Sequence, residues 1–186
     1  MDKKNLIIFG VIVLLAGYFW SFYNKFVSLD EGINAQWAQV ESQYQRRLDL
    51  IPNLVETVKG AMAQEQTIFK DLADARAKYS GAKTIDQKAE AATQVEGALS
   101  RLLVVMENYP QLTSMQTVNT LMVQLEGTEN RIAVERQRYN EKVQEFNASI
   151  KKVPNNLIAS LFGFSEKTYF ESQEEAQNAP KVDLSK

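Results

Sequence analysis

The residues of this chain most able to do chemistry are charged side chains that fall on otherwise apolar helical registers. Glu65 and Arg76 interrupt one apolar series, and Glu129 and Arg136 interrupt a later one. An unpaired ion at such a position is costly, so each has a partner or lies at the edge of the apolar stripe, where its charge reaches water. We predict at least one ion pair between helices. Arg76 with Glu129 is the first choice, although Glu65 or Arg136 could take either place, and such a pair could set helix register or subunit pairing.

The composition offers few side chains suited to catalysis or to metal binding. The sequence has no His and no Cys, which removes most zinc, copper, haem and iron–sulfur sites and every Ser-His or Cys-His nucleophile. The residues Gly81-Ala82-Lys83-Thr84 resemble the end of a phosphate-binding loop, but the glycine before the lysine, the earlier glycine and the preceding strand are missing. We therefore predict no enzymatic activity, no cofactor, no metal and no small-molecule substrate.

The charge distribution argues against nucleic acid as a partner. The 186 residues carry a net charge of −2. Lys and Arg are interspersed with Asp and Glu, so no basic stripe could neutralise phosphates.

An uncharged apolar run over residues 6–22 predicts a membrane span. As a helix it is about 25 Å long, and with its polar flanks it can cross the hydrocarbon core. Lys3 and Lys4 precede it, and amphipathic aromatic rings that favour the headgroup layer gather at its far end. The predicted anchor, residues 1–23, is represented by Leu6, Ile7, Ile8, Val11, Leu14, Leu15, Tyr18, Trp20 and Phe22.

A cleaved signal peptide is the alternative for this run. It would share the basic start and the apolar stretch, but small residues at the usual cleavage spacing are absent and aromatic bulk follows. We therefore expect an uncleaved, single-pass anchor. Two lysines, Lys3 and Lys4, precede the span, whereas only Lys25 follows it closely. Because positive charge gathers on the cytoplasmic side, this favours a cytoplasmic amino terminus and an extracytoplasmic remainder at the bacterial cytoplasmic membrane.

The rest of the chain predicts an all-α fold in which the transmembrane helix continues into an antiparallel bundle of long helices with a coiled-coil-like seam. Apolar residues recur at steps of three and four from Ile33 to Tyr79, and we interpret this stretch as one helix. The steps of four from Val40 to Tyr44 and Leu48 suggest a stutter, and Pro52 predicts a kink.

Two further helices follow, over residues 85–108 and 112–150. Residues 80–83 predict a turn, and Thr84 with Gln87 has the spacing of a capping box. Pro110 and Pro154 end the preceding helices. An apolar segment, residues 157–164, is a candidate for membrane contact. We predict one bundle domain over residues 24–170 and a disordered tail over 171–186.

Lengths predict self-association. A helix over residues 24–79 extends about 85 Å, whereas residues 85–108 return only about 36 Å. The membrane-proximal stripe would then lack a covering helix and would form an interface between copies of the chain. Its residues are Ile33, Trp37, Val40 and Tyr44. A sharp bend at Pro52 or Gly127 could instead cover the stripe internally.

The sequence resembles the LemA family over nearly its whole length. The run Arg46-Arg47-Leu48-Asp49-Leu50-Ile51-Pro52-Asn53-Leu54-Val55-Glu56-Thr57-Val58 matches the family signature. Later blocks follow in order: Ala75-Arg76-Ala77, Glu107-Asn108-Tyr109-Pro110, Thr128-Glu129-Asn130-Arg131-Ile132-Ala133, Arg138-Tyr139-Asn140 and Leu161-Phe162-Gly163-Phe164. Leu48 departs from the aromatic residue expected there. The resemblance implies an amino-terminal membrane helix, an antiparallel bundle and no established enzymatic activity.

These observations favour a non-catalytic structural or scaffolding element that self-associates at the lipid bilayer. One alternative is an accessory regulator or adaptor of another membrane protein or envelope system, which would need an exposed apolar groove on a monomer. Another is a lipid-binding or membrane-remodelling element that uses the apolar segment near Leu157.

Overall fold

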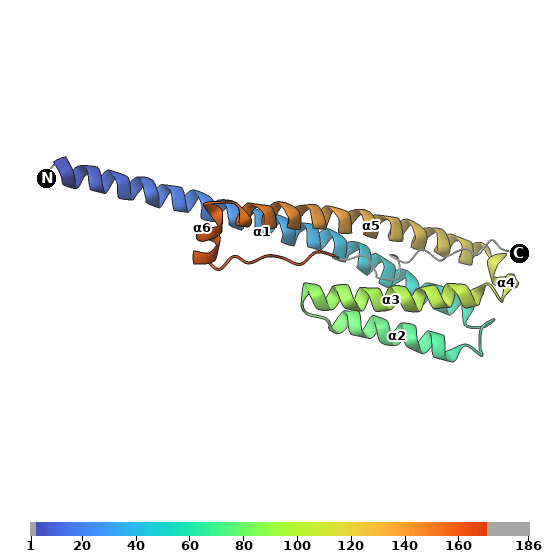
Figure 1. Ribbon diagram of the computed structural model, residues 1–186. Helices are drawn as coiled ribbons and strands as arrows, with labels where there is room; N and C mark the ends of the chain where they lie inside the picture. Colours follow the sequence, from blue (N-terminus) through green and yellow to red (C-terminus); the bar gives the residue numbers. More distant parts are fainter. Residues whose placement is uncertain (1–2, 171–186) are drawn as a thin grey trace, which may run out of the picture. The chain divides into compact units, whose positions relative to one another are not determined.

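A computed structural model describes residues 3–170, and this part of the chain is all-α, as predicted (Figure 1). The predicted disordered tail, residues 171–186, lies outside the described residues. The helices of the described part are α1 (Lys3–Val58), α2 (Gln66–Gly81), α3 (Ile85–Met106), α4 (Pro110–Thr113), α5 (Gln116–Lys151) and α6 (Asn155–Leu161).

The described residues form two compact units, and the single bundle over residues 24–170 stays a prediction. Unit 1 contains residues 3–30 and 139–170, and unit 2 contains residues 31–138. The division falls inside α1 and inside α5, so each of these helices contributes one part to each unit.

The first long helix ends earlier than predicted. α1 stops at Val58 and a turn over residues 59–65 leads into α2. Periodicity did not reveal this break because Val58 and Met62, both fully buried, keep helical spacing through the turn. Gly60, a weak helix former, was the local signal.

The apolar stripe of α1 in unit 2 also differs from its prediction. Its buried residues recur at alternating steps of four and three, and Leu48, which is 5% exposed, is buried beside them, so the predicted stutter stays a prediction. The alternating series contains one charged member, Arg47, which is 1% exposed. Its members are Ile33, Trp37, Val40, Tyr44, Arg47, Ile51, Leu54 and Val58. Pro52 lies within α1, and a kink there stays a prediction.

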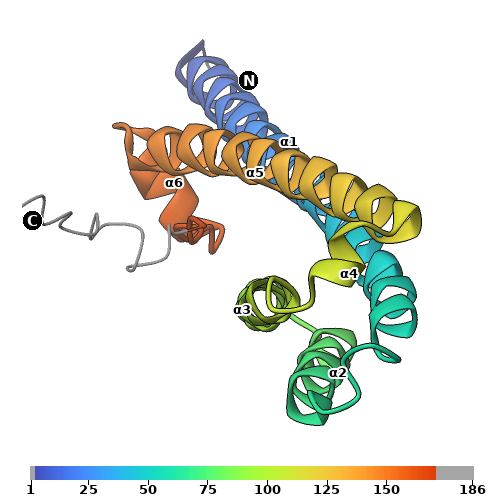
Figure 2. The same ribbon diagram turned by 90° about the vertical axis from the view of Figure 1, so that its right-hand side faces the viewer.

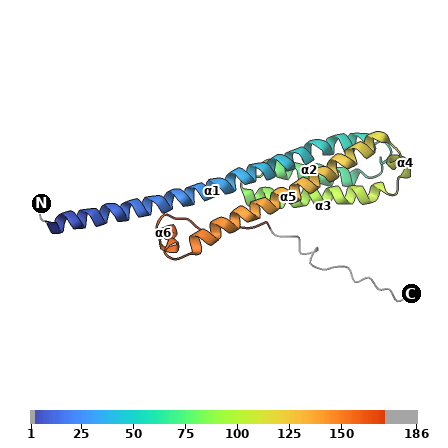
Figure 3. The same ribbon diagram turned by 90° about the horizontal axis from the view of Figure 1, so that it is seen from above.

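The predicted exposed stripe is buried within the chain's own unit 2. Ile33, Trp37, Val40 and Tyr44 are all buried, so the premise of our length argument was wrong. α1 ends at Val58, and the unit 2 part of α5 runs back along it, as Figures 1 and 3 show.

α2 and α3 form an antiparallel hairpin in unit 2 (Figure 1), and Figure 2 shows the same two helices side by side. The predicted capping box is confirmed: the Gln87 N–H donates to the Thr84 hydroxyl, and the Thr84 N–H donates to the Gln87 side chain. α3 ends at Met106, before Pro110, which opens α4. Small buried residues let the two helices approach closely, namely Ala75, Ala91, Ala92 and Ala98.

Candidate functional site

The amino-terminal part of α1 presents its apolar side chains to the surroundings. An 18-residue window of this helix has a mean hydropathy of 2.1 and is not buried at all, so the helix is long and apolar enough to cross a membrane. The predicted anchor residues with exposed side chains are Leu6, Ile7, Ile8, Val11, Leu14, Tyr18 and Trp20, and Phe22 is half-buried.

An aromatic cluster follows the apolar run directly in unit 1. The ring centroid of Phe164 lies 5.4 Å from that of Phe26 and 6.3 Å from that of Phe146. Tyr23 stacks at 5.1 Å against Phe162. Edge-to-face contacts of this kind join α1, α5 and the residues after α6 into one small core.

Two asparagines of α5 hold the segment after α6 by its backbone. Asn147 donates from Nδ2 to the Lys167 carbonyl and accepts the Lys167 N–H at Oδ1, both at 2.9 Å. Asn140 makes the same pair of bonds with Phe170, at 2.9 and 2.8 Å. Residues 165–170, called the strap below, are therefore fixed by main-chain contacts.

Ion pairs add to the attachment of the strap. Lys167 Nζ lies 2.6 Å from a carboxylate oxygen of Asp30, and Lys151 Nζ lies 2.7 Å from one of Glu166. Lys167 also lies over the Phe146 ring, 5.7 Å from its centroid. These pairs join the strap to α1 and to α5.

Unit 2 contains a buried guanidinium group, that of Arg47. The Arg47 side chain is 2% exposed and pairs with the carboxylate of Glu129 on α5, which is 46% exposed. The Arg47 guanidinium also lies 5.8 Å from the centroid of the Tyr44 ring. The predicted pair of Arg76 with Glu129 was therefore wrong, because Arg47 takes the Glu129 carboxylate.

Burial dominates the electrostatics around Arg47. It lowers the pKa of Arg47, and it raises the pKa of Tyr44 and of Tyr79. Nε and Nη1 of Arg47 and the Tyr79 hydroxyl have no hydrogen-bond partner among the described residues. The hollow between them is too narrow for a water molecule, so we interpret the cluster as structural.

Of the remaining seam charges, Arg136 lies near the Arg47 pair, whereas Glu65 and Arg76 have other surroundings. Glu65, in the turn before α2, accepts a hydrogen bond of 3.2 Å from the Tyr109 hydroxyl. Arg76 is half-buried, and its Nε has no hydrogen-bond partner in the described part of the chain. Arg136 lies near Tyr44, where its charge opposes the rise of the tyrosine pKa. The structure thus does not gather the four predicted charges into one site.

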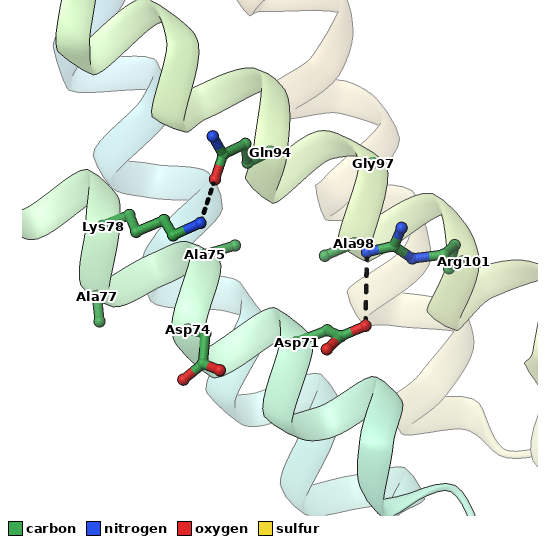
Figure 4. A pocket seen from close by; sticks show the side chains of 9 residues that line it. All are labelled: Asp71, Asp74, Ala75, Ala77, Lys78, Gln94, Gly97, Ala98 and Arg101. Carbon is green, nitrogen blue, oxygen red and sulfur yellow. Dashed lines mark hydrogen bonds and ion pairs between the residues drawn. The ribbon is translucent and has the colours of Figure 1, made fainter.

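A groove of about 610 Å³ lies between α2 and α3 (Figure 4). Polar side chains bridge it: Lys78 donates to Gln94 at 3.0 Å, and Arg101 lies 3.7 Å from Asp71. Arg101 is thus paired with a carboxylate, whereas Lys78 is paired with a neutral amide.

A second groove, of about 430 Å³, lies between α3 and α5 in unit 2. Leu99 and Leu125 are buried at its base, whereas Glu126 is exposed. This volume lies within the range of ligand-binding clefts. Its lining combines apolar and acidic side chains, and consists of Glu96, Leu99, Ser100, Leu103, Met122, Leu125, Glu126, Glu129 and Asn130.

The pattern of the LemA family matches residues 36–184. The chain belongs to the LemA family. The magnetosome proteins MamQ 1 and MamQ 2 of Paramagnetospirillum magneticum are each 30% identical to it over 177 residues, which cover 81% of this chain and 65% of each relative. MamQ of Magnetospirillum gryphiswaldense is 29% identical over 174 residues, covering 80% and 64%.

These comparisons confirm the resemblance that the sequence motifs indicated. The LemA chain spans about 65% of the length of the MamQ relatives. Neither the family nor these relatives is named for an enzymatic activity.

Sequence reasoning missed the residues that make the most specific contacts of this LemA chain. Arg47 continues the alternation of four and three, but the adjacent apolar residue, Leu48, which is also buried, was assigned to the stripe instead. Asn140 and Asn147 lie seven positions apart. That spacing places both on one face of a helix and could have suggested a shared partner.

Proposed function

We propose that this LemA protein is a non-catalytic, membrane-anchored adaptor. α1 crosses the cytoplasmic membrane with its amino end in the cytoplasm, and unit 2 binds a protein partner. The observation that supports the membrane anchor most directly is the 18-residue apolar window of α1, none of which is buried. Water would solvate such a surface poorly, whereas the hydrocarbon core of a bilayer matches its length and composition.

The groove between α3 and α5 is the proposed partner site. Leucine and methionine side chains line its interior, and Glu96, Glu126 and Glu129 contribute carboxylates. The complementary partner is a protein segment that inserts an apolar side chain and carries a lysine or arginine beside it.

The burial of the α1 stripe favours an adaptor over a self-associating scaffold. Ile33, Trp37, Val40 and Tyr44 are covered by their own chain, so they need no second copy to shield them. An exposed groove on a single chain was the feature that the adaptor hypothesis required.

A mass measurement in mild detergent tests this choice. We expect a protein mass of one chain across a wide concentration range. A discrete assembly that persists on dilution would contradict the adaptor proposal and favour the scaffold.

Site-specific photo-cross-linking tests the groove itself. A photoreactive residue at Ser100, inside the groove, should give a discrete adduct in native membranes, and Glu126→Lys should abolish that adduct. Val104 is the matched control, because it is exposed on α3 but does not line the groove. Equal adducts at both positions, or none at Ser100, would contradict the proposed site.

A self-associating scaffold is the second candidate, supported by a different surface. Val123 and Val134 of α5 are 68% and 46% exposed. They lie eleven positions apart, which is close to three helical turns, so they share a face that two copies could bury.

A further inference from the structure

α6 carries an exposed apolar ridge that nothing in the described chain covers. Leu157 and Leu161 lie four positions apart, so they project from one face of the helix, and they are 71% and 72% exposed. Val153, in the turn before α6, is 82% exposed. The opposite face is anchored in unit 1 by the buried side chains of Ile158 and Ala159.

The ridge lies at the level where the membrane span ends. Phe162, directly after α6, stacks against Tyr23, directly after the apolar run of α1. Tyr18, Phe19, Trp20 and Tyr23 are exposed aromatic residues at that end of the span, and such rings favour the headgroup layer. α6 is therefore placed beside the same interface.

The direction of α6 suits a bilayer surface. It runs crosswise to the neighbouring parts of α1 and α5 in unit 1. Figure 1 shows α6 from the side, and Figure 3 shows it nearly end-on. If α1 crosses the membrane, a helix crosswise to it lies along the membrane plane. That is the attitude of an interfacial amphipathic helix.

Contacts on both sides of α6 hold it in this attitude. At its first residue, the buried side chain of Asn155 donates to the Ser149 carbonyl of α5 at 2.9 Å. After it, Phe164 packs on Phe26 and Phe146, and Asn147 fixes the strap at Lys167. The ridge is thus presented by a braced element.

We propose that α6 is a second membrane contact, an interfacial helix whose ridge of Leu157 and Leu161, with Val153 from the preceding turn, enters the bilayer that α1 spans. This inference rests on the proposed anchor. The occupant is lipid, because the ridge adjoins the exposed apolar surface of the span. Exposed Lys25 and Lys152 lie close by in sequence to Tyr23 and Val153, and favour anionic headgroups.

The absence of cysteine from the sequence allows a direct depth measurement. Single variants Leu157→Cys and Leu161→Cys of the full chain are spin-labelled and reconstituted into vesicles of phosphatidylcholine and phosphatidylglycerol. Accessibility to oxygen, which concentrates in lipid, is compared with accessibility to a water-soluble nickel chelate. Leu14→Cys is the control inside the span, and Gln144→Cys, exposed on α5 in unit 1, is the aqueous control.

We expect labels at 157 and 161 to behave like the label at 14, with oxygen accessibility raised and nickel accessibility lost relative to 144. Nickel accessibility at 161 with lipid burial at 14 would overturn the interfacial helix and leave the anchor standing. Shielding of 161 from both reagents would mean that protein covers the ridge, which also overturns the inference. A label at 14 that is accessible to nickel would instead refute the proposed anchor.

Discussion

Asn140 and Asn147 lie one heptad apart on α5, and their side chains form hydrogen bonds with the backbone of two strap residues that are three positions apart. Seven helical residues rise about 10.5 Å and three extended residues about 10 Å, so the two attachments stay in register. Because Asn140 holds Phe170 and Asn147 holds Lys167, the strap runs antiparallel to α5. It is recognised through its main chain, as a strand is recognised by a sheet edge.

Replacing Asn147 with Ala should loosen the strap without unfolding unit 2. The change removes two hydrogen bonds, each contributing about 0.5–1.5 kcal/mol, so the Lys167 amide should exchange its hydrogen markedly faster. Gln144→Ala, at an exposed position of α5, is the matched control. Unchanged exchange at Lys167 in the Asn147 variant would show that the asparagine contacts do not hold the strap.

The ion pair of Arg47 and Glu129 should respond differently to the removal of each partner. Glu129→Ala leaves a buried guanidinium unpaired, and we expect the free energy of unfolding to fall by about 3 kcal/mol. Arg47→Met replaces the buried charge with an apolar chain of similar length, so the loss should be smaller. Urea unfolding of the full chain in mild detergent measures both. If Arg47→Met lowered the free energy of unfolding more than Glu129→Ala, the cost of burying the unpaired guanidinium would not be the main effect.

The helical elements were predictable because local signals define them. Thr84 and Gln87 indicated the start of α3, and Pro110 and Pro154 follow closely on the ends of α3 and α5. The LemA signature and the exposed apolar run were equally visible in the sequence.

The tertiary arrangement was not predictable from periodicity alone. Val58 and Met62 keep helical spacing across the turn after α1, so the apolar periodicity gave no sign of the turn and Gly60 alone marked it locally. The partner of Arg47 depends on which helices become neighbours. The strap contacts of Asn140 depend on a segment thirty residues away. Contacts between residues far apart in the sequence cannot be inferred from local sequence patterns.

Tyr79 should make the stability of unit 2 depend on alkaline pH. Burial, with the charge of Glu41 as the second cause, raises the pKa of Tyr79 above its unfolded value of about 10. Above pH 10 the unfolded chain releases this proton while the folded chain keeps it, so the free energy of unfolding falls as pH rises. Below that pH the contribution is fully present.

Tyr79→Phe isolates this effect. The Tyr79 hydroxyl has no hydrogen-bond partner among the described residues, so its removal should change stability at pH 7 by less than about 1 kcal/mol. Unfolding measured between pH 9 and 11 should then depend less steeply on pH than in the wild type. An unaltered pH slope would exclude Tyr79 as its source.

Pro52→Ala tests the predicted kink in α1. Proline within a helix removes a backbone donor and costs about 3 kcal/mol, so alanine should preserve or increase helicity. Circular dichroism and thermal unfolding of the full chain report the outcome. A fall of several degrees in the melting temperature would show that unit 2 depends on the bend at this half-buried proline.

Membrane anchoring by the exposed apolar part of α1 is the central claim, and alkaline carbonate extraction tests it most directly. The full chain should stay in the membrane pellet, whereas a variant lacking residues 3–22 should move to the supernatant. Mass spectrometry of the pelleted protein should find residues 3–22 intact, which separates an anchor from a cleaved signal peptide. Release of the intact full chain by carbonate would contradict the account.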